Sequence, residues 1–245
     1  MIKAVFIDID GTLKNSKKEV SKKTKIEIER CIQKDIKIIL TSGRSEKETI
    51  EHQQELKTSP YIISSNGASC YDIKKEQEFY SVPLKRKIIQ QLFEFTNKNG
   101  YNIKFNYKDK IALSRALYQD EKDKEKSTEE LKKIIQNERI IQCVILNSNI
   151  EKMKELKEVL KRNFPETKIV NESKRIEHPE LEPSKNYYCD VVSTEVSKGR
   201  AVCEMCKYLN LKEEEIMTIG DGENDISMFN ITPYSVVMGN ALDNV

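Results

Sequence analysis

The chain has 245 residues and a mass of 28.5 kDa, which is enough for one large or two modest domains with a substantial core. Its 42 basic side chains nearly balance 40 acidic ones, so the formal net charge is only +2. Because charges of both signs are interspersed along the chain, we expect neither a nucleic-acid-binding surface nor a basic membrane anchor.

Neither a secretory signal nor a membrane span is expected. The N-terminal apolar stretch ends at Asp8, which is too short for a signal peptide, and no later segment approaches the ~20 apolar residues of a span. The six cysteines lie in apolar or strand-like settings. Cys203 and Cys206 have C-x-x-C spacing, but they lie in a predicted helix with no second pair of metal ligands nearby. We therefore expect reduced thiols and a cytoplasmic protein, whose oligomeric state the sequence does not reveal.

The first ~80 residues alternate between predicted strands and helices, the pattern of a doubly wound parallel sheet. A helix is expected after Ser21, with Ile28, Cys31 and Ile32 on one face. A second helix is expected from Ser45, where acidic residues in the first turn favour the helix dipole. Apolar runs predict strands at residues 4–7, 38–40 and 61–63, and a hairpin at residues 68–80.

Two carboxylates, Asp8 and Asp10, follow the first predicted strand, and Gly11 allows a tight turn after them. In open α/β sheets, ligands bind beyond the carboxyl ends of the strands. We expect the two carboxylates to leave the sheet together and point the same way, where their repulsion favours a cation or a proton between them. For this segment alone, a strand end followed by an ordinary Asp-Gly turn remains the alternative.

Ser42, Gly43 and Arg44 follow the second predicted strand. The Ser42 hydroxyl can donate to a phosphate oxygen, and the Gly43 amide can approach a ligand closely because glycine has no Cβ. The planar guanidinium of Arg44 suits a phosphate or a carboxylate. Taken alone, a Ser-Gly turn explains this segment equally well.

From about residue 82 to residue 192 the pattern changes to that of a self-contained α+β domain. This domain interrupts a second one made of residues 1–81 and 193–245, and the crossings near residues 81–83 and 193–197 are expected to be hinges. The mixed-charge stretch at residues 120–130 is interpreted as a solvated loop entering a helix. Helices are predicted around residues 88–98, 131–135 and 153–160, and strands at 101–107, 111–113, 140–146, 168–170 and 187–192.

Lys198 lies in the first turn of a further predicted helix, with Ser197 or Thr194 as its cap. A cation at this position opposes the helix dipole and costs up to ~1 kcal/mol. Most lysines are solvated surface residues, but this unfavourable position favours an anionic partner. The apolar face of the helix comprises Ala201, Val202, Met205, Cys206 and Leu209.

Asp221 and Asp225 follow a strand predicted at residues 216–219. If this strand and the first two are parallel neighbours, both acids join Asp8 and Asp10 in a cluster that needs a cation to stay ionised. Oxygen ligands favour a hard cation such as Mg²⁺. A histidine-based metal site is not expected, because the chain has only two histidines and neither is near a cluster, at positions 52 and 178.

Taken in order, DIDGTL, TSGR, SKG and GDGEND resemble the four motifs of the haloacid dehalogenase superfamily, and most closely its Cof-like hydrolases, the type IIB phosphatases. Residues 63–68 (ISSNGA) and 237–241 (VMGNA) match further stretches of that branch. The resemblance implies a Rossmann-like core and a mobile α+β cap, residues 82–192, that covers the active site. Members usually continue past MGNA with another strand and helix, so we expect either a shorter sheet edge here or a truncated form.

The resemblance also implies a role for each motif residue. Asp8 would be the nucleophile that becomes an aspartyl-phosphate, and Asp10 would be the general acid and base. Mg²⁺ would be bound by Asp8, the Asp10 carbonyl and Asp221, with Asp225 supporting it directly or through water. Arg44 and Asn66 are further candidates for contacting the substrate. The phosphoryl oxygens would be held by the Ile9 amide, Ser42, the Gly43 amide, Lys198 and Asn224.

These features favour a Mg²⁺-dependent phosphatase acting on small phosphorylated metabolites, such as sugar phosphates. One alternative is a phosphomutase on the same scaffold, although the phosphomutases considered carry a different second motif. The other is a non-catalytic phosphoryl-binding regulator, which would have lost the nucleophile or the acid, whereas Asp8 and Asp10 are both present. No motif in the cap identifies the substrate.

Overall fold

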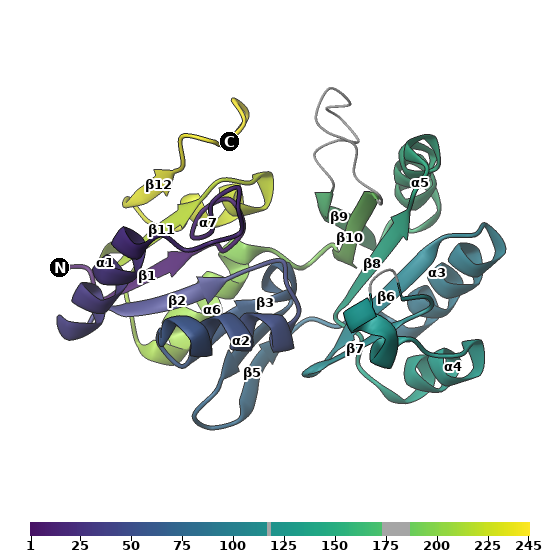
Figure 1. Cartoon of the computed structure of the whole chain (residues 1–245), viewed down its shortest axis with the longest axis horizontal. Coiled ribbons are helices and arrows are strands. Elements are labelled where there is room, and N and C mark those ends of the chain that lie inside the picture. The colour runs from purple at the N-terminus through teal and green to yellow at the C-terminus, as the bar shows by residue number, and fades with distance from the viewer. Residues whose placement is uncertain (117–118, 173–186) are drawn as a thin grey trace. The chain divides into compact units, whose positions relative to one another are not determined.

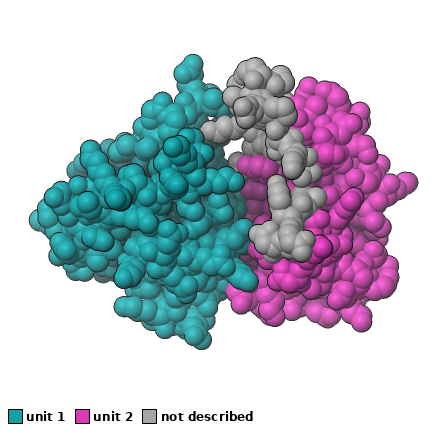
Figure 2. Space-filling model, in the orientation of Figure 1, with its two compact units in different colours: residues 1–81, 196–245 teal, residues 82–195 magenta. Residues whose placement is uncertain are grey.

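The computed structural model describes residues 1–116, 119–172 and 187–245 of the chain. Contacts within the chain divide it into two compact units, coloured separately in Figure 2. The first unit comprises Met1–Ser81 and Val196–Val245, and the second comprises Val82–Glu195. Each unit is described by itself below.

The first unit is built on a seven-stranded sheet (Figure 1). Five strands are parallel, and the hairpin expected at residues 68–80 adds the two antiparallel ones. The predicted doubly wound parallel sheet is therefore confirmed. In spatial order the strands are β12 (Ser235–Val237), β11 (Ile216–Gly220), β1 (Ala4–Ile7), β2 (Lys37–Thr41), β3 (Tyr61–Ser64), β4 (Ser69–Asp72) and β5 (Gln77–Ser81).

Helices cover both faces of this sheet, and each face has its own apolar core. Alternate residues of β1 point to opposite faces, as the period of a strand requires. Ala4 and Phe6 join the core under α6 (Lys198–Leu209) and α7 (Ile226–Phe229). Val5 and Ile7 join the core under α1 (Lys22–Gln33) and α2 (Glu46–Leu56). Short 3₁₀ helices complete the unit: η1 (Ser65–Gly67), η4 (Glu213–Glu215) and η5 (Glu223–Asp225).

The first two helices begin where they are expected. Ser21 and Ser45 accept hydrogen bonds from the amides of Thr24 and Glu48 and so cap α1 and α2. On the expected apolar face of α1, Ile28 is buried, whereas Ile32 is 39% exposed. Ile32 lies in the last turn of α1 and lines an open surface hollow.

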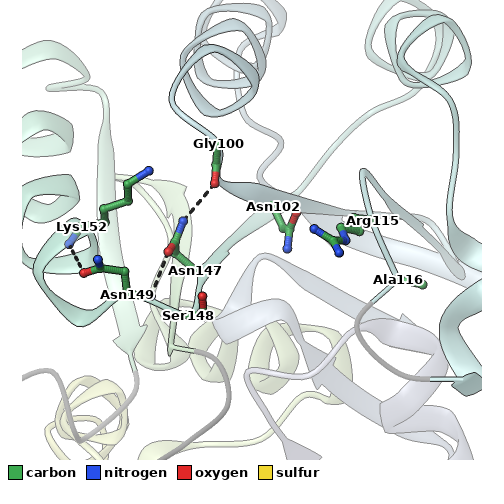
Figure 3. A pocket seen from close by; sticks show the side chains of 8 residues that line it. All are labelled: Gly100, Asn102, Arg115, Ala116, Asn147, Ser148, Asn149 and Lys152. Atoms are coloured by element: carbon green, nitrogen blue, oxygen red, sulfur yellow. Dashed lines mark hydrogen bonds between the residues drawn. The ribbon is translucent and has the colours of Figure 1, made fainter.

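The second unit is a five-stranded sheet in which all neighbouring strands are antiparallel. Three helices pack on one face and enclose a single apolar core, which includes Leu92, Phe105, Leu131, Ile145 and Leu156. Beside the start of α5 the unit has an open hollow (Figure 3). The strands, in spatial order, are β7 (Lys110–Leu113), β6 (Asn102–Tyr107), β8 (Gln142–Asn147), β10 (Tyr187–Ser193) and β9 (Thr167–Glu172), and the helices are α3 (Arg86–Lys98), α4 (Thr128–Asn137) and α5 (Ile150–Asn163).

The loop expected at residues 120–130 is partly wrong. Gln119–Lys124 forms a 3₁₀ helix, η2, before α4 begins. The Lys126 amide donates to the Leu113 carbonyl (2.9 Å), which links the chain just after this helix to the end of β7. His178 lies outside the described residues. Within the described ranges, no helix has both the length and the apolar character needed to cross a membrane.

Candidate active site

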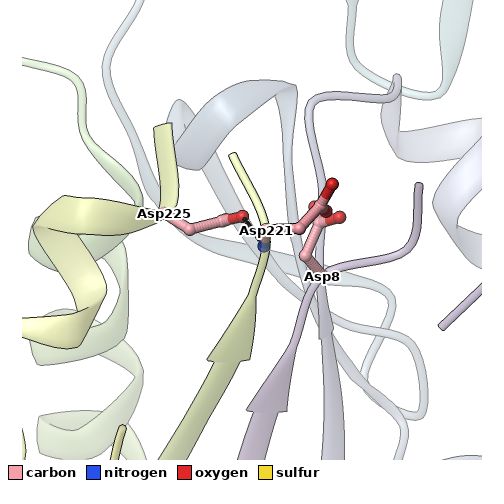
Figure 4. A group of neighbouring side chains, drawn as sticks. All are labelled: Asp8, Asp221 and Asp225. Carbon is pink, nitrogen blue, oxygen red and sulfur yellow. Dashed lines mark hydrogen bonds between the residues drawn. The ribbon is translucent and has the colours of Figure 1, made fainter. Parts of the chain in front are cut away.

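The ends of three neighbouring parallel strands bring the predicted acidic residues together. β1 lies between β11 and β2, with Ile7 in register with Ile219 on one side and Leu40 on the other. Asp8 and Asp221 therefore leave the same edge of the sheet, as Figure 4 shows. This edge is where open α/β sheets place their ligand sites.

Lys198 connects two of the acids. It is the first residue of α6, whose cap is Ser197, and its side chain is completely buried. Its Nζ lies 2.6 Å from Asp8 Oδ1 and 2.5 Å from Asp225 Oδ1. The anionic partner expected from the position of Lys198 is therefore a pair of carboxylates from this chain.

Burial and the charges of neighbouring groups both shift the pKa values of Asp8 and Lys198. Burial raises the pKa of Asp8, and the charges of Asp225 and Asp221 raise it further; Lys198 opposes both, and the pKa is about 7. Burial would lower the pKa of Lys198, but the carboxylates of Asp8 and Asp225 outweigh it and hold that pKa above its usual range. Lys198 is therefore a permanent cation beside Asp8.

The loop after β11 fixes Asp225 and Asp221 by hydrogen bonds. Asp225 Oδ2 accepts from the amides of Asp221 (3.0 Å) and Gly222 (2.9 Å). Asp221 Oδ1 accepts from the Thr12 hydroxyl (2.8 Å), and Oδ2 accepts from Asn240 Nδ2 (3.1 Å). The sequence analysis gave no role to Thr12 or Asn240. Both nevertheless lie inside stretches that resemble the family, DIDGTL and VMGNA, and that was the available signal.

Gly11 is required where this loop meets the turn after β1. Its φ is +89°, and a Cβ there would lie 2.2 Å from Asp221 Oδ2. No side chain can be added at this position without displacing Asp221.

The carboxylates of Asp8, Asp221 and Asp225 suit a hard divalent cation. One oxygen from each lies within 4.8 Å of the others, and all three residues are buried. With all groups ionised, three negative charges face the single charge of Lys198. The donors are oxygens only, which favours Mg²⁺ over zinc or copper. These residues therefore fit the metal that the sequence implied.

Asp10 is paired with Arg44. Arg44 holds it through two hydrogen bonds, from Nε to Oδ2 and from Nη2 to Oδ1, both 2.7 Å. Burial raises the pKa of Asp10, but the hydrogen bonds and charge of Arg44 outweigh it and lower the pKa below its usual value. Because β1 and β2 are neighbours, the residues that follow them place the Arg44 fork beside Asp10.

Ser42, Gly43, Asn66 and Asn224 meet on the other side of the strand ends. The Ser42 carbonyl accepts from the Asn66 amide (3.0 Å), and Asn224 Nδ2 donates to Asn66 Oδ1 (2.8 Å). A Cβ on Gly43 would lie only 3.0 Å from Asn66 Oδ1, so a larger residue at this position would crowd the Asn66 side chain. Asn66 has a φ of +60°, a conformation that asparagine tolerates better than most residues. Ile9 follows Asp8 with its side chain buried in the core.

Comparison with known proteins was made against sequences and solved structures. Residues 5–245 match the profile of the haloacid dehalogenase-like hydrolases. The chain belongs to this family. It is 25% identical to phosphatase YwpJ of Bacillus subtilis, over 100% of this chain and 92% of that protein. It is also 25% identical to the 5-amino-6-(5-phospho-D-ribitylamino)uracil phosphatase YcsE of the same organism, over 100% of this chain and 86% of that protein.

Solved structures agree with this assignment. A haloacid dehalogenase-like hydrolase from Bacteroides thetaiotaomicron superimposes with a TM-score of 0.82 at 23% identity, covering 100% of this chain and 91% of that one, which shows the shared fold. A subclass IIB sugar phosphatase of the superfamily superimposes with a TM-score of 0.77 at 25% identity, covering 99% and 89%. The resemblance read from the four motifs is confirmed, and the chain is a phosphatase of the haloacid dehalogenase superfamily.

Proposed function

We propose that this protein is a Mg²⁺-dependent phosphatase that hydrolyses small phosphorylated metabolites, including sugar phosphates, through an aspartyl-phosphate on Asp8. The observation that carries the proposal is the buried Asp8 carboxylate, 2.6 Å from the buried Lys198 ammonium and grouped with Asp221 at the ligand-binding edge of the sheet. A nucleophile beside a permanent cation is placed to attack a phosphorus atom whose oxygens carry negative charge.

In the first proposed step, an Asp8 oxygen attacks the phosphorus, and the bond from phosphorus to the leaving oxygen breaks. Asp10 donates a proton to that oxygen, so the product leaves as an alcohol. In the second step Asp10 takes a proton from water as the water oxygen attacks the phosphorus, which releases phosphate and restores Asp8. Acid–base catalysis of this kind contributes roughly 10²–10⁴-fold.

The other motif residues would bind the phosphoryl group and the metal. Lys198, the Ser42 hydroxyl, the Asn224 side chain and the amides of Ile9 and Gly43 would hold the phosphoryl oxygens. Mg²⁺, held by Asp8, the Asp10 carbonyl and Asp221, would neutralise charge that builds up on the transferring group. Asp225 has both oxygens occupied by Lys198 and two amides, which supports an indirect role in positioning Lys198.

Arg44 adds a condition to this mechanism. While its guanidinium holds Asp10, the lowered pKa keeps Asp10 ionised, which suits a base but not an acid. We infer that Arg44 turns to the substrate when a phosphate ester binds, which releases Asp10 to carry a proton.

The relatives support the proposed substrate class. One relative is named as the phosphatase of a phosphorylated ribityl compound, and one structural neighbour as a sugar phosphatase. The proposal extends to a cytoplasmic location, supported by six cysteines that are all free thiols. It includes residues 82–195 as the cap, with hinges where the two units join.

The test is a screen of phosphorylated metabolites for released phosphate, run with the wild type and with Asp8→Asn. The substitution keeps the shape of the side chain but removes the nucleophile, so turnover should fall at least ~10³-fold on every ester that the wild type hydrolyses. Asp109→Asn, an exposed site in the second unit, is the matched control and should keep the wild-type rate. An Asp8→Asn protein with an appreciable share of the wild-type rate would rule out the covalent mechanism.

A further inference from the structure

An open polar hollow lies on the surface of the second unit, beside the start of α5, and its residues Arg115, Ser148 and Lys152 are exposed. It has a volume of about 480 Å³, within the size range of small-molecule sites. Its polar lining consists of Asn102, Arg115, Asn147, Ser148, Asn149 and Lys152, with only a glycine and an alanine besides. We call it the Arg115 pocket.

Two of the lining asparagines build the rim of the Arg115 pocket. Asn147 donates to the Gly100 carbonyl (3.0 Å) and accepts from the Asn149 amide (2.9 Å). The Asn149 side chain accepts from the amides of Glu151 and Lys152 and so caps α5. The hydrogen bonds of these two side chains are made within the protein. They therefore shape the pocket, and we assign them no contact with a ligand.

The other polar groups remain available. Figure 3 shows the Arg115 guanidinium and the Asn102 carboxamide directed toward one another across the pocket. Among the residues that the structure describes, the side chains of Arg115, Asn102 and Ser148 have no hydrogen-bond or ion-pair partner.

The charge of the Arg115 pocket is also unbalanced. Lys152 Nζ is held by the Asn99 carbonyl (3.0 Å) and lies 5.7 Å from the centre of the Tyr101 ring. Neither Lys152 nor Arg115 has a carboxylate partner within the described part of the chain, although the whole sequence has nearly as many acids as bases. Among the residues that the structure describes, no acidic and no aromatic side chain lines the pocket. Such a lining suits an anion with hydroxyl groups and offers no stacking surface for a flat ring.

We propose that the Arg115 pocket binds a small hydroxylated anion, through Arg115 and Lys152 to its charged group and through Asn102 and Ser148 to its hydroxyls. The chemistry is that of a sugar acid or of the charged end of a sugar phosphate. The anion could be part of the phosphatase substrate or a separate metabolite, and the experiment below distinguishes these sources.

The probe is D-gluconate, a six-carbon sugar carboxylate, titrated calorimetrically into the full-length protein without added metal. Sorbitol, which has the same hydroxyls and no charge, is the matched neutral probe. We expect saturable binding of gluconate below about 10 mM and much weaker binding of sorbitol. Arg115→Gln should weaken gluconate binding about tenfold, and Arg115→Lys should lose less because it keeps the charge.

Arg162→Gln is the matched control, because Arg162 is exposed, lies on α5 and does not line the pocket. It should bind gluconate as the wild type does. No saturable binding, equal binding of sorbitol, or equal binding by Arg115→Gln and the wild type would each overturn the proposal.

Kinetics then identify the source of the anion. If it is part of the substrate, gluconate competes with anionic esters, and Arg115→Gln lowers kcat/KM for those esters but not for p-nitrophenyl phosphate. If it is a separate metabolite, gluconate changes the rate without competing, and Arg115→Gln removes that change. Both results support the site, and they do not depend on the covalent mechanism proposed for Asp8.

Discussion

Three carboxylates and one ammonium group share a space at the ends of β1 and β11 that water hardly reaches. Asp8, Asp221, Asp225 and Lys198 are each 6% exposed or less. Burial is the main cause of the raised pKa of Asp8, and the charges of Asp225 and Asp221 add to it. With all four groups ionised, the cluster carries two excess negative charges. A divalent cation would cancel them, so metal binding should show in stability as well as in activity.

We therefore expect Mg²⁺ to raise the midpoint of thermal unfolding of the wild type. At a hundred times its dissociation constant, a ligand of the folded state adds about 2.7 kcal/mol. Asp221→Asn should lose most of this shift, whereas Asp109→Asn should keep it. Scanning calorimetry at several Mg²⁺ concentrations measures the effect, and an equal shift in the Asp221→Asn protein would show that Mg²⁺ binds elsewhere.

Activity should likewise require Mg²⁺ and be inhibited by Ca²⁺. The larger ion takes more ligands and can draw both oxygens of Asp8 into coordination, which leaves none for attack. Phosphate release after chelation, and after adding back each ion, measures this. Full activity in the chelated protein, or strong support by Ca²⁺ alone, would contradict the proposed metal site.

At the scale of elements, the position of Lys198 depends on how closely two helical segments approach. Gly199 follows Lys198 in α6, and its amide donates to the Ser227 hydroxyl (3.1 Å). A Cβ on Gly199 would lie 2.1 Å from the Ser227 carbonyl oxygen, which is backbone and cannot rotate away. The short α7 can pack on the start of α6 only because residue 199 is glycine.

Gly199→Ala should therefore destabilise the protein by about 1–3 kcal/mol and lower turnover, since the strain is relieved by moving Lys198 or the loop that carries Asp225. Gly239→Ala is the matched control, because nothing lies within 4 Å of a Cβ there and its φ is not positive. It should be neutral or slightly stabilising. Urea unfolding of both variants measures the difference, and equal stability would refute the close approach.

The sequence could predict secondary structure, which depends on nearby residues, better than side-chain contacts between distant residues. Apolar periodicity and a helix start such as Ser45 depend on neighbours in the chain, so most strands and helices were predicted near their observed positions. The motifs likewise placed Asp8, Lys198 and Asp221 at strand and helix ends that prove adjacent. The Arg44–Asp10 pair depends instead on which rotamer reaches across two strands, and no local pattern encodes that.

The local sequence pattern also did not predict the exposure of side chains at the ends of helices or the position of the 3₁₀ helix. Ile32 fits the apolar face of α1 by spacing, yet it is 39% exposed in the last turn of that helix. After the 3₁₀ helix at Gln119–Lys124, the Lys126 amide bonds to Leu113, a residue whose closeness only the folded sheet establishes.

At the scale of the whole molecule, the two units have separate apolar cores. Every residue of the core in the second unit lies between Leu84 and Val191. The two cores of the first unit draw only on residues 4–80 and 201–231. Since the described residues of the two units share no apolar core, we expect that the segment at 82–195 can be exchanged without leaving a cavity in the unit that carries Asp8.

We expect residues 82–195 to determine which ester is cleaved, while the first unit performs the chemistry. The acids, Ser42 and Lys198 all belong to the first unit, and a cap that closes over the phosphoryl group would place its own side chains against the leaving group. Replacing residues 82–195 with the matching segment of a family member of different ester preference should therefore transfer that preference.

The chimera and both parents are screened against one panel of esters, with calorimetry confirming that the chimera unfolds cooperatively. Its Mg²⁺ requirement should match that of this chain, because the metal ligands are unchanged. A folded chimera that keeps the preference of the Asp8-containing unit would show that the selecting residues lie in the first unit.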